Sequence, residues 1–100
     1  MTIVKIIENI LGYPITQIQK LKHSSDDDFH ICIGDNAARE TISNSLNVNY
    51  PILTHPTSFV STLSTIGEGT SIMPLASIKA ASEIGKHCII NAGAIIGHDV

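Results

Sequence analysis

Aliphatic residues recur at every sixth position through the second half of this 100-residue chain. The series runs through Val60, Ile66, Ile72, Ile78, Ile84, Ile90 and Ile96. Four residues after each comes a residue of small or modest size: Ser64, Thr70, Ala76, Ser82, Cys88, Ala94 and Val100. A helix would return its apolar face about every 3.6 residues and a half-buried strand about every two, so a period of six fits neither. The repeat is typical of a parallel β-helix.

In this architecture each six-residue unit forms one side of a triangular prism, and three units close one coil. Coils stack at the strand spacing of about 4.8 Å, so residues one coil apart should lie above one another. Glycines at 67, 69 and 85 mark corners, where tight turns need positive φ. We therefore expect three inward stacks: Val60 with Ile78 and Ile96, Ile66 with Ile84, and Ile72 with Ile90.

The middle of the chain predicts alternating strand and helix. Residues 29–33 are a compact apolar strand, and Asp35 or Asn36 after it can cap a helix over about residues 37–46. Pro51-Ile52-Leu53 is predicted as a second short strand. This order indicates a small α/β sheet with parallel strands. We expect two partial domains, at residues 1–56 and 57–100.

The opening residues are less decisive. Residues 3–11 carry apolar side chains at helix-like spacing, but their β-branched density also permits a strand. Tyr13-Pro14-Ile15 is predicted to be extended. The acidic run at residues 24–28 lacks the central glycine and terminal glutamate of a calcium loop, so it predicts a solvated loop rather than a metal site.

Composition narrows the functional classes. A hydrophobic content of 43% with no tryptophan predicts an aliphatic core, which suits stacked coils. The net charge of −3 offers no basic surface for nucleic acid, and no apolar run is long enough to span a membrane. Cys32 and Cys88 lie in apolar runs and are predicted to be core residues of a cytoplasmic protein.

Two motifs can carry chemistry. Gly34-Asp35-Asn36 and Arg39 stand at the carboxyl end of a strand, where open α/β sheets bind ligands. Amides at a helix N-terminus favour an anionic group, and Arg39 can reach a phosphate. The spacing alone favours the plainer interpretation, in which Gly34 makes the turn, Asp35 caps the helix and Arg39 lies in solvent.

The second motif is His98-Asp99, at an outward position near a prism corner. A histidine beside an acid can act as a general base, although an ordinary exposed histidine would look the same. Asn91 also points away from the core, where stacking between coils and ligand contact are both open to it.

Three features follow one another along the chain: the strand with its Gly-Asp-Asn turn, the His55-Pro56 turn, and hexapeptides ending in Ile96-Gly97-His98-Asp99. In this order they resemble the sugar O-/N-acetyltransferases of the sialic-acid and bacillosamine biosynthesis type. The resemblance covers about residues 10–100. It implies a Rossmann-like domain for the sugar or nucleotide-sugar substrate, followed by a left-handed β-helix. It also implies a homotrimer with acetyl-CoA between adjacent β-helices.

The resemblance also implies roles for individual residues. His98 would be the general base and Asp99 its acidic neighbour, while Asn91 would line the site. Gly34, Asp35 and Asn36 would help to hold the substrate, with Arg39 nearby. The implied reaction is direct acetyl transfer, in which His98 takes a proton from the acceptor amine or hydroxyl as that atom attacks the thioester.

Relatives of this type open with a glycine-rich loop well before the matched region and continue through further coils after the His-Asp pair. We therefore expect the chain to be a fragment or truncated product that is inactive alone. Two alternatives stay open from the residues. One is a zinc hydrase of the γ-carbonic anhydrase kind, which needs three histidines around one metal. The other is a non-catalytic β-helix that serves as a trimerisation module.

Overall fold

The structure is a computed structural model that describes residues 2–4, 9–10, 13–16 and 28–100. It divides into two compact units, Met1–Pro51 and Ile52–Val100, each of which is described by itself. The division falls after residue 51, whereas the sequence predicted one after residue 56.

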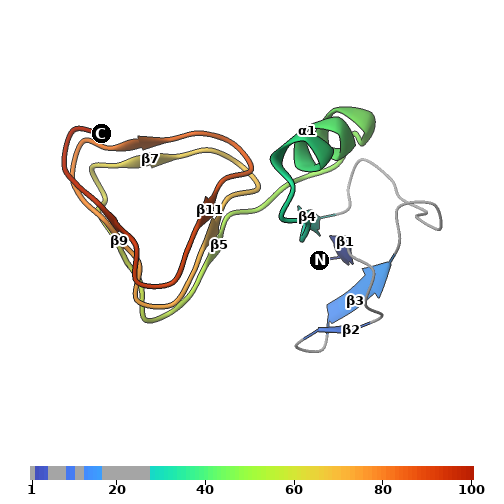
Figure 1. Ribbon diagram of the computed structural model, residues 1–100, viewed down its shortest axis with the longest axis horizontal. Helices are drawn as coiled ribbons and strands as arrows, with labels where there is room; N and C mark the ends of the chain where they lie inside the picture. The colour runs from blue at the N-terminus through green and yellow to red at the C-terminus, as the bar shows by residue number, and fades with distance from the viewer. Residues whose placement is uncertain (1, 5–8, 11–12, 17–27) are drawn as a thin grey trace. The chain divides into compact units, whose positions relative to one another are not determined.

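The second unit is a three-sided coil of short parallel strands (Figure 1). The strands are β5 (Leu53–Thr54), β6 (Phe59–Val60), β7 (Thr65–Ile66), β8 (Ser71–Ile72), β9 (Ser77–Ile78), β10 (Glu83–Ile84), β11 (Ile89–Ile90) and β12 (Ile95–Ile96). One side is the sheet β11-β8-β5, the next is β12-β9-β6, and the third is β10-β7. Each aliphatic residue of the six-residue repeat is the second residue of its strand.

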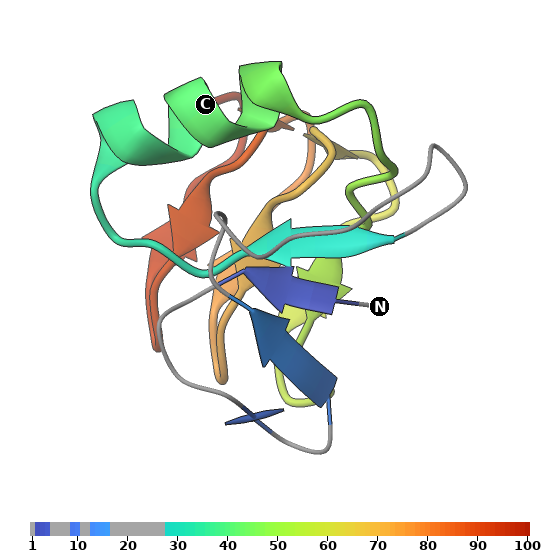
Figure 2. The ribbon, with the colours of Figure 1, turned by 90° about the vertical axis from the view of Figure 1, so that its right-hand side faces the viewer.

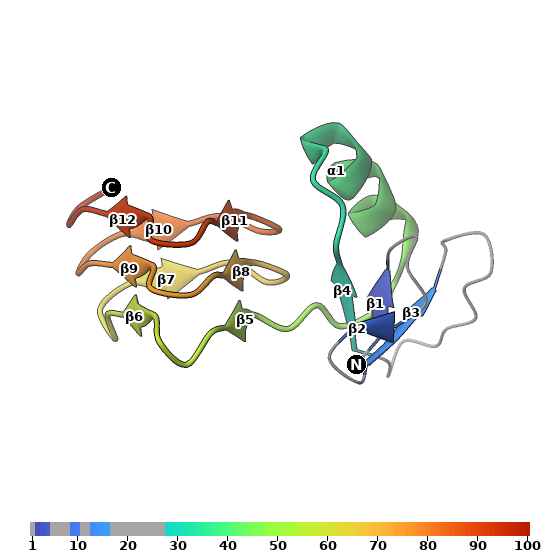
Figure 3. The same ribbon diagram turned by 60° about the horizontal axis from the view of Figure 1, so that its bottom comes forward.

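The strand register confirms the predicted stacking. Ile84 pairs with Ile66, Ile90 with Ile72, and Ile96 with Ile78. The two residues of each pair therefore lie one coil apart. Val60 completes the third stack by pairing with Ile78. Figure 3 shows the resulting coils as stacked layers.

Strand β5 lies in the second unit, contrary to the prediction for residues 51–53. Leu53 pairs with Ser71 and Thr54 with Ile72, so this strand belongs to the β-helix. The prediction that residues 51–53 form a strand of the α/β sheet is therefore wrong. The reason is that Thr54 occupies the repeat position six residues before Val60, and a threonine there hid the start of the period.

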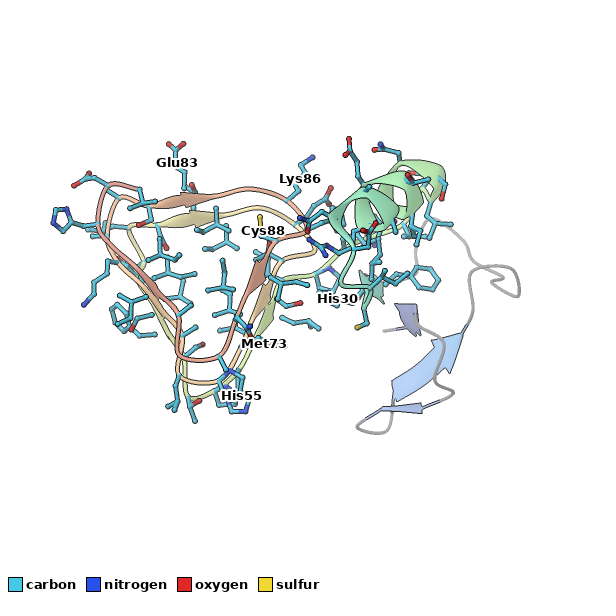
Figure 4. All side chains as sticks on the ribbon, in the orientation of Figure 1. His30, His55, Met73, Glu83, Lys86 and Cys88 are labelled. Carbon is cyan, nitrogen blue, oxygen red and sulfur yellow. The ribbon has the colours of Figure 1, made fainter. Side chains whose placement is uncertain are left out.

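The interior of the coil is aliphatic, with hydroxyl groups at two corners. Ile72, Ala76, Ile78 and Ile90 are buried at its centre. Thr70 and Ser82 are fully buried, and their hydroxyls donate to the carbonyl oxygens of Gly85 at 2.9 Å and Gly97 at 2.7 Å. These bonds satisfy polar groups that burial would otherwise leave without water. In Figure 4 the sulfur of Cys88 lies on the inner side of the coil, while Glu83 and Lys86 project outward.

The corners repeat one backbone conformation. Positive φ recurs every six residues along the coil, and it occurs at Gly69, Leu75, Ala81, His87, Gly93 and Asp99. The left-handed region is easily reached by glycine and is several-fold enriched in aspartate compared with other residues. The corner conformation is therefore a property of the coil, which side chains other than glycine also adopt.

The first unit contains a four-stranded sheet in the order β2-β3-β1-β4. Its strands are β1 (Thr2–Val4), β2 (Asn9–Ile10), β3 (Tyr13–Thr16) and β4 (Phe29–Ile31). Strand β1 runs parallel to both β3 and β4, and β2 is antiparallel to β3. The sheet contains parallel strands, as predicted, but they are β1 with β3 and β4, and not residues 29–33 with residues 51–53. The extended conformation at residues 13–15 is confirmed, while the loop predicted at 24–28 lies outside the described residues except for Asp28.

Helix α1 (Asn36–Ser45) follows β4; in Figure 2 the helix is green and β4 is cyan. Phe29, Ile31 and Tyr50 form a buried core cluster among residues 28–51 of this unit. Ile42 and Leu46 pack against that core, so this side of the helix is its apolar face. No helix in the described part of the chain is long and apolar enough to cross a membrane.

Candidate functional site

His98 and Asp99 form the turn that follows β12. Nδ1 of His98 lies 2.9 Å from Oδ2 of Asp99, and the two side chains are 80% and 72% exposed. An ionised carboxylate can only accept a hydrogen bond, so Nδ1 of a neutral imidazole carries the proton in this pair. Nε2 then presents its lone pair outward, which is the form a general base requires.

The backbone around this exposed pair is tied to the coil beneath. The amide of Asp99 donates to the carbonyl oxygen of Ala80 at 3.0 Å, and the amide of Glu83 donates to Val100 at 2.8 Å. The hydroxyl of Ser82 donates to Gly97 at 2.7 Å. Asp99 has φ of 61°, as the corner of the coil requires. The imidazole is thus solvent-exposed on an anchored turn.

Asn91 is exposed directly after β11, as the sequence predicted. Its side-chain oxygen accepts from the amide of Ala92 at 2.8 Å, which shapes the next corner. His98 lies at the following corner, beyond β12. Within one chain a whole side of the prism therefore separates Asn91 from His98.

The Gly34-Asp35-Asn36 turn lies in the first unit. Asp35 is the N-cap of α1, and its Oδ2 accepts from the amide of Ala38 at 2.8 Å. Residues 34–36 are exposed, and an added Cβ at Gly34 would meet open space. The capping role predicted for Asp35 is confirmed. The hydrogen bond from Ala38 uses one of the two carboxylate oxygens of Asp35.

Arg39 is placed differently from either sequence interpretation. It is only 8% exposed. Its Nη1 donates to the carbonyl oxygen of Ile33 at 2.9 Å and to that of Gly34 at 2.8 Å, and its Nη2 donates to Oδ1 of Asn36. Side chains on a helix lean toward its N-terminus, which is the only signal in the sequence that could have directed Arg39 back onto the turn.

The described residues offer no ligand set for the zinc hydrase alternative. No group of three or more His, Cys, Asp or Glu side chains in these ranges is arranged to hold a metal ion. Cys32 and Cys88 are both half-buried, and no disulfide joins them to each other. His87 is half-buried at a corner of the coil, and a Cβ added to Gly69 would collide with its ring.

Comparisons with known proteins give matches for the repeats and for most of the chain. Residues 64–98 match the family described as bacterial transferase hexapeptide (six repeats). PerB from Caulobacter crescentus, solved with CoA and GDP-perosamine, is 29% identical with a TM-score of 0.77. That match covers 92% of this chain and 48% of PerB.

The acetyltransferase domain of PglB from Neisseria gonorrhoeae, solved with acetyl coenzyme A, is 27% identical with a TM-score of 0.78. It is matched over 95% of this chain and 49% of its own. The chain thus spans about half the length of these solved structures. No curated protein sequence gives a match. The resemblance to sugar acetyltransferases of the hexapeptide type is confirmed by these structures.

Proposed function

We propose that the chain forms part of an acetyl-CoA-dependent acetyltransferase that acts on a sugar presented as a nucleotide sugar. The observation that carries the proposal is the exposed His98–Asp99 pair on an anchored corner of a hexapeptide coil. Support comes from PerB, whose structure holds CoA and GDP-perosamine, and from the PglB domain, whose structure holds acetyl coenzyme A.

The chemistry follows from the tautomer of His98. Nε2 takes a proton from the amine or hydroxyl of the sugar while that atom attacks the thioester carbonyl carbon. The tetrahedral intermediate collapses with cleavage of the carbon–sulfur bond, and the CoA thiolate leaves and is then protonated. Asp99, bonded to Nδ1, stabilises the imidazolium that forms. A positioned base of this kind contributes about 10²–10⁴-fold in rate.

The proposal extends to how the units divide the work. The first unit is a Rossmann-like domain that holds the nucleotide sugar at Gly34, Asp35 and Asn36. This place is supported by the parallel pairing of β4, because ligands of such sheets bind at the carboxyl ends of strands. The second unit is a left-handed β-helix of a homotrimer, with acetyl-CoA between the β-helices of adjacent chains and Asn91 lining the same groove.

Acetyl transfer to a nucleotide-linked amino sugar tests this function. Because the chain matches about half of PerB, the assay uses both the chain alone and a hybrid in which the chain replaces the matching half of PerB. We expect the hybrid to move labelled acetyl from acetyl-CoA to GDP-perosamine or a UDP-linked amino sugar, detected as the acetylated sugar by mass spectrometry. A folded hybrid that binds acetyl-CoA yet acetylates none of these sugars would refute the proposal.

A further inference from the structure

We infer that Arg39 is a positioning residue, whose guanidinium shapes the turn at residues 33–36 for the nucleotide sugar without contacting that substrate. The inference rests on the proposed function, because it assumes that this turn holds the sugar nucleotide. It assigns Arg39 a different role from the direct phosphate contact that its place in the sequence suggested.

Arg39 binds three successive carbonyl groups of the turn. Its guanidinium Nη1 donates to Ile33 at 2.9 Å and to Gly34 at 2.8 Å, while its main-chain amide donates to Asp35 at 3.0 Å. All three acceptors are therefore directed toward one residue. Because that residue is only 8% exposed, the carbonyl side of the turn is closed to solvent at this point.

The opposite side of the turn carries the amides. In a trans peptide the carbonyl and the following N–H point in opposite directions. With the carbonyls of residues 33, 34 and 35 turned toward Arg39, the N–H groups of residues 34, 35 and 36 face away from it. Among the residues that the structure describes, none accepts a hydrogen bond from these three amides. The turn thus presents a row of donors suited to the oxygens of a nucleotide.

Arg39 also orients the side chain of Asn36. Its Nη2 donates to Oδ1 of Asn36, which leaves the amide group of that side chain directed elsewhere. A planar guanidinium can hold two carbonyls and a side-chain oxygen together, whereas the ammonium of lysine is a compact point charge on a flexible stem. The geometry of the fork, and not the charge alone, is what the turn requires.

Two substitutions separate positioning from direct contact. Arg39→Lys keeps the charge and loses the fork, and Arg39→Gln loses both. If Arg39 positions the turn, both variants weaken binding of GDP-perosamine or a UDP-linked amino sugar to the PerB hybrid by about tenfold or more, and the salt dependence of binding stays as in the parent hybrid. Affinity for acetyl-CoA should not change. If Arg39→Lys binds the nucleotide sugar with nearly the parent affinity while Arg39→Gln binds it weakly, the inference is overturned in favour of direct contact between Arg39 and the substrate.

Ile42→Val is the matched control, because Ile42 packs on the core of the same unit and makes no bond to the turn. It should lower the melting temperature and leave nucleotide-sugar affinity within twofold. An equal loss of affinity in Ile42→Val would mean that Arg39 acts only through stability, which also overturns the inference.

Relaxation of the backbone amides of residues 34–36 gives a readout that needs no ligand. These amides should be rigid in the parent chain and markedly more mobile in Arg39→Lys, with the amides of α1 beyond residue 40 unchanged. Unchanged mobility of the turn refutes the role of Arg39. Failure of the parent hybrid to bind any nucleotide sugar refutes the proposed function instead, so the two failures are distinguishable.

Discussion

At the scale of single residues, the coils are held by close approach of backbone to backbone. A Cβ added to Gly67 would lie 2.5 Å from both the carbonyl oxygen of Gly85 and the amide nitrogen of Lys86. At Gly85 the nearest atom to an added Cβ is the sulfur of Cys88, at 3.8 Å. Two corner glycines that look equivalent in the sequence therefore differ, because the constraint on each comes from the neighbouring coil.

This difference predicts unequal effects of the same substitution. Gly67→Ala should lower the free energy of unfolding by about 2–3 kcal/mol, since rigid backbone must move to admit the methyl group. Gly85→Ala, the matched control, should change it by less than about 1 kcal/mol. Urea denaturation followed by circular dichroism measures both values. Equal destabilisation by the two substitutions would show that the coils do not approach as described.

At the scale of elements, the parts set by short-range pattern were predictable and the parts set by distant contacts were not. The isoleucine stacks and the helix capped by Asp35 follow from spacing within a few residues. Strand β5 was missed because Thr54 breaks the aliphatic series, and only its pairing with Ile72 reveals the register. The burial of Arg39 was missed because it depends on the direction of carbonyl groups, which the residue types do not encode.

The cap of α1 gives a prediction at this scale. Asp35→Ala removes the acceptor for the amide of Ala38 and should lower the free energy of unfolding of the first unit by about 1 kcal/mol. Asp35→Ser retains an acceptor and should lower the free energy of unfolding by only about a few tenths of a kcal/mol. Thermal unfolding monitored at amide resonances of α1 reports this unit separately. A cost as large for Asp35→Ser as for Asp35→Ala would contradict the capping role.

At the scale of the whole molecule, the regular coil of the second unit was predictable from the sequence alone. The six-residue period predicted the coil, and the strand register confirmed the prediction. Such a prediction is possible because each repeat contacts only its neighbours. The partners of His98 in a reaction were not predictable in the same way. A reaction also depends on groups of its substrates, which the sequence of the chain does not contain, and the chain spans about half the length of the solved structures it matches.

The central claim is that His98 is the base for acetyl transfer, and its exposed side chain makes the test clean because its removal leaves the anchored turn intact. The rate of acetyl transfer by the PerB hybrid should fall by about 10²–10⁴-fold in His98→Ala, with acetyl-CoA affinity and the urea midpoint unchanged. His55→Ala, which removes another exposed histidine of the same unit, should keep the rate within twofold. A rate in His98→Ala within threefold of the parent hybrid would contradict the account.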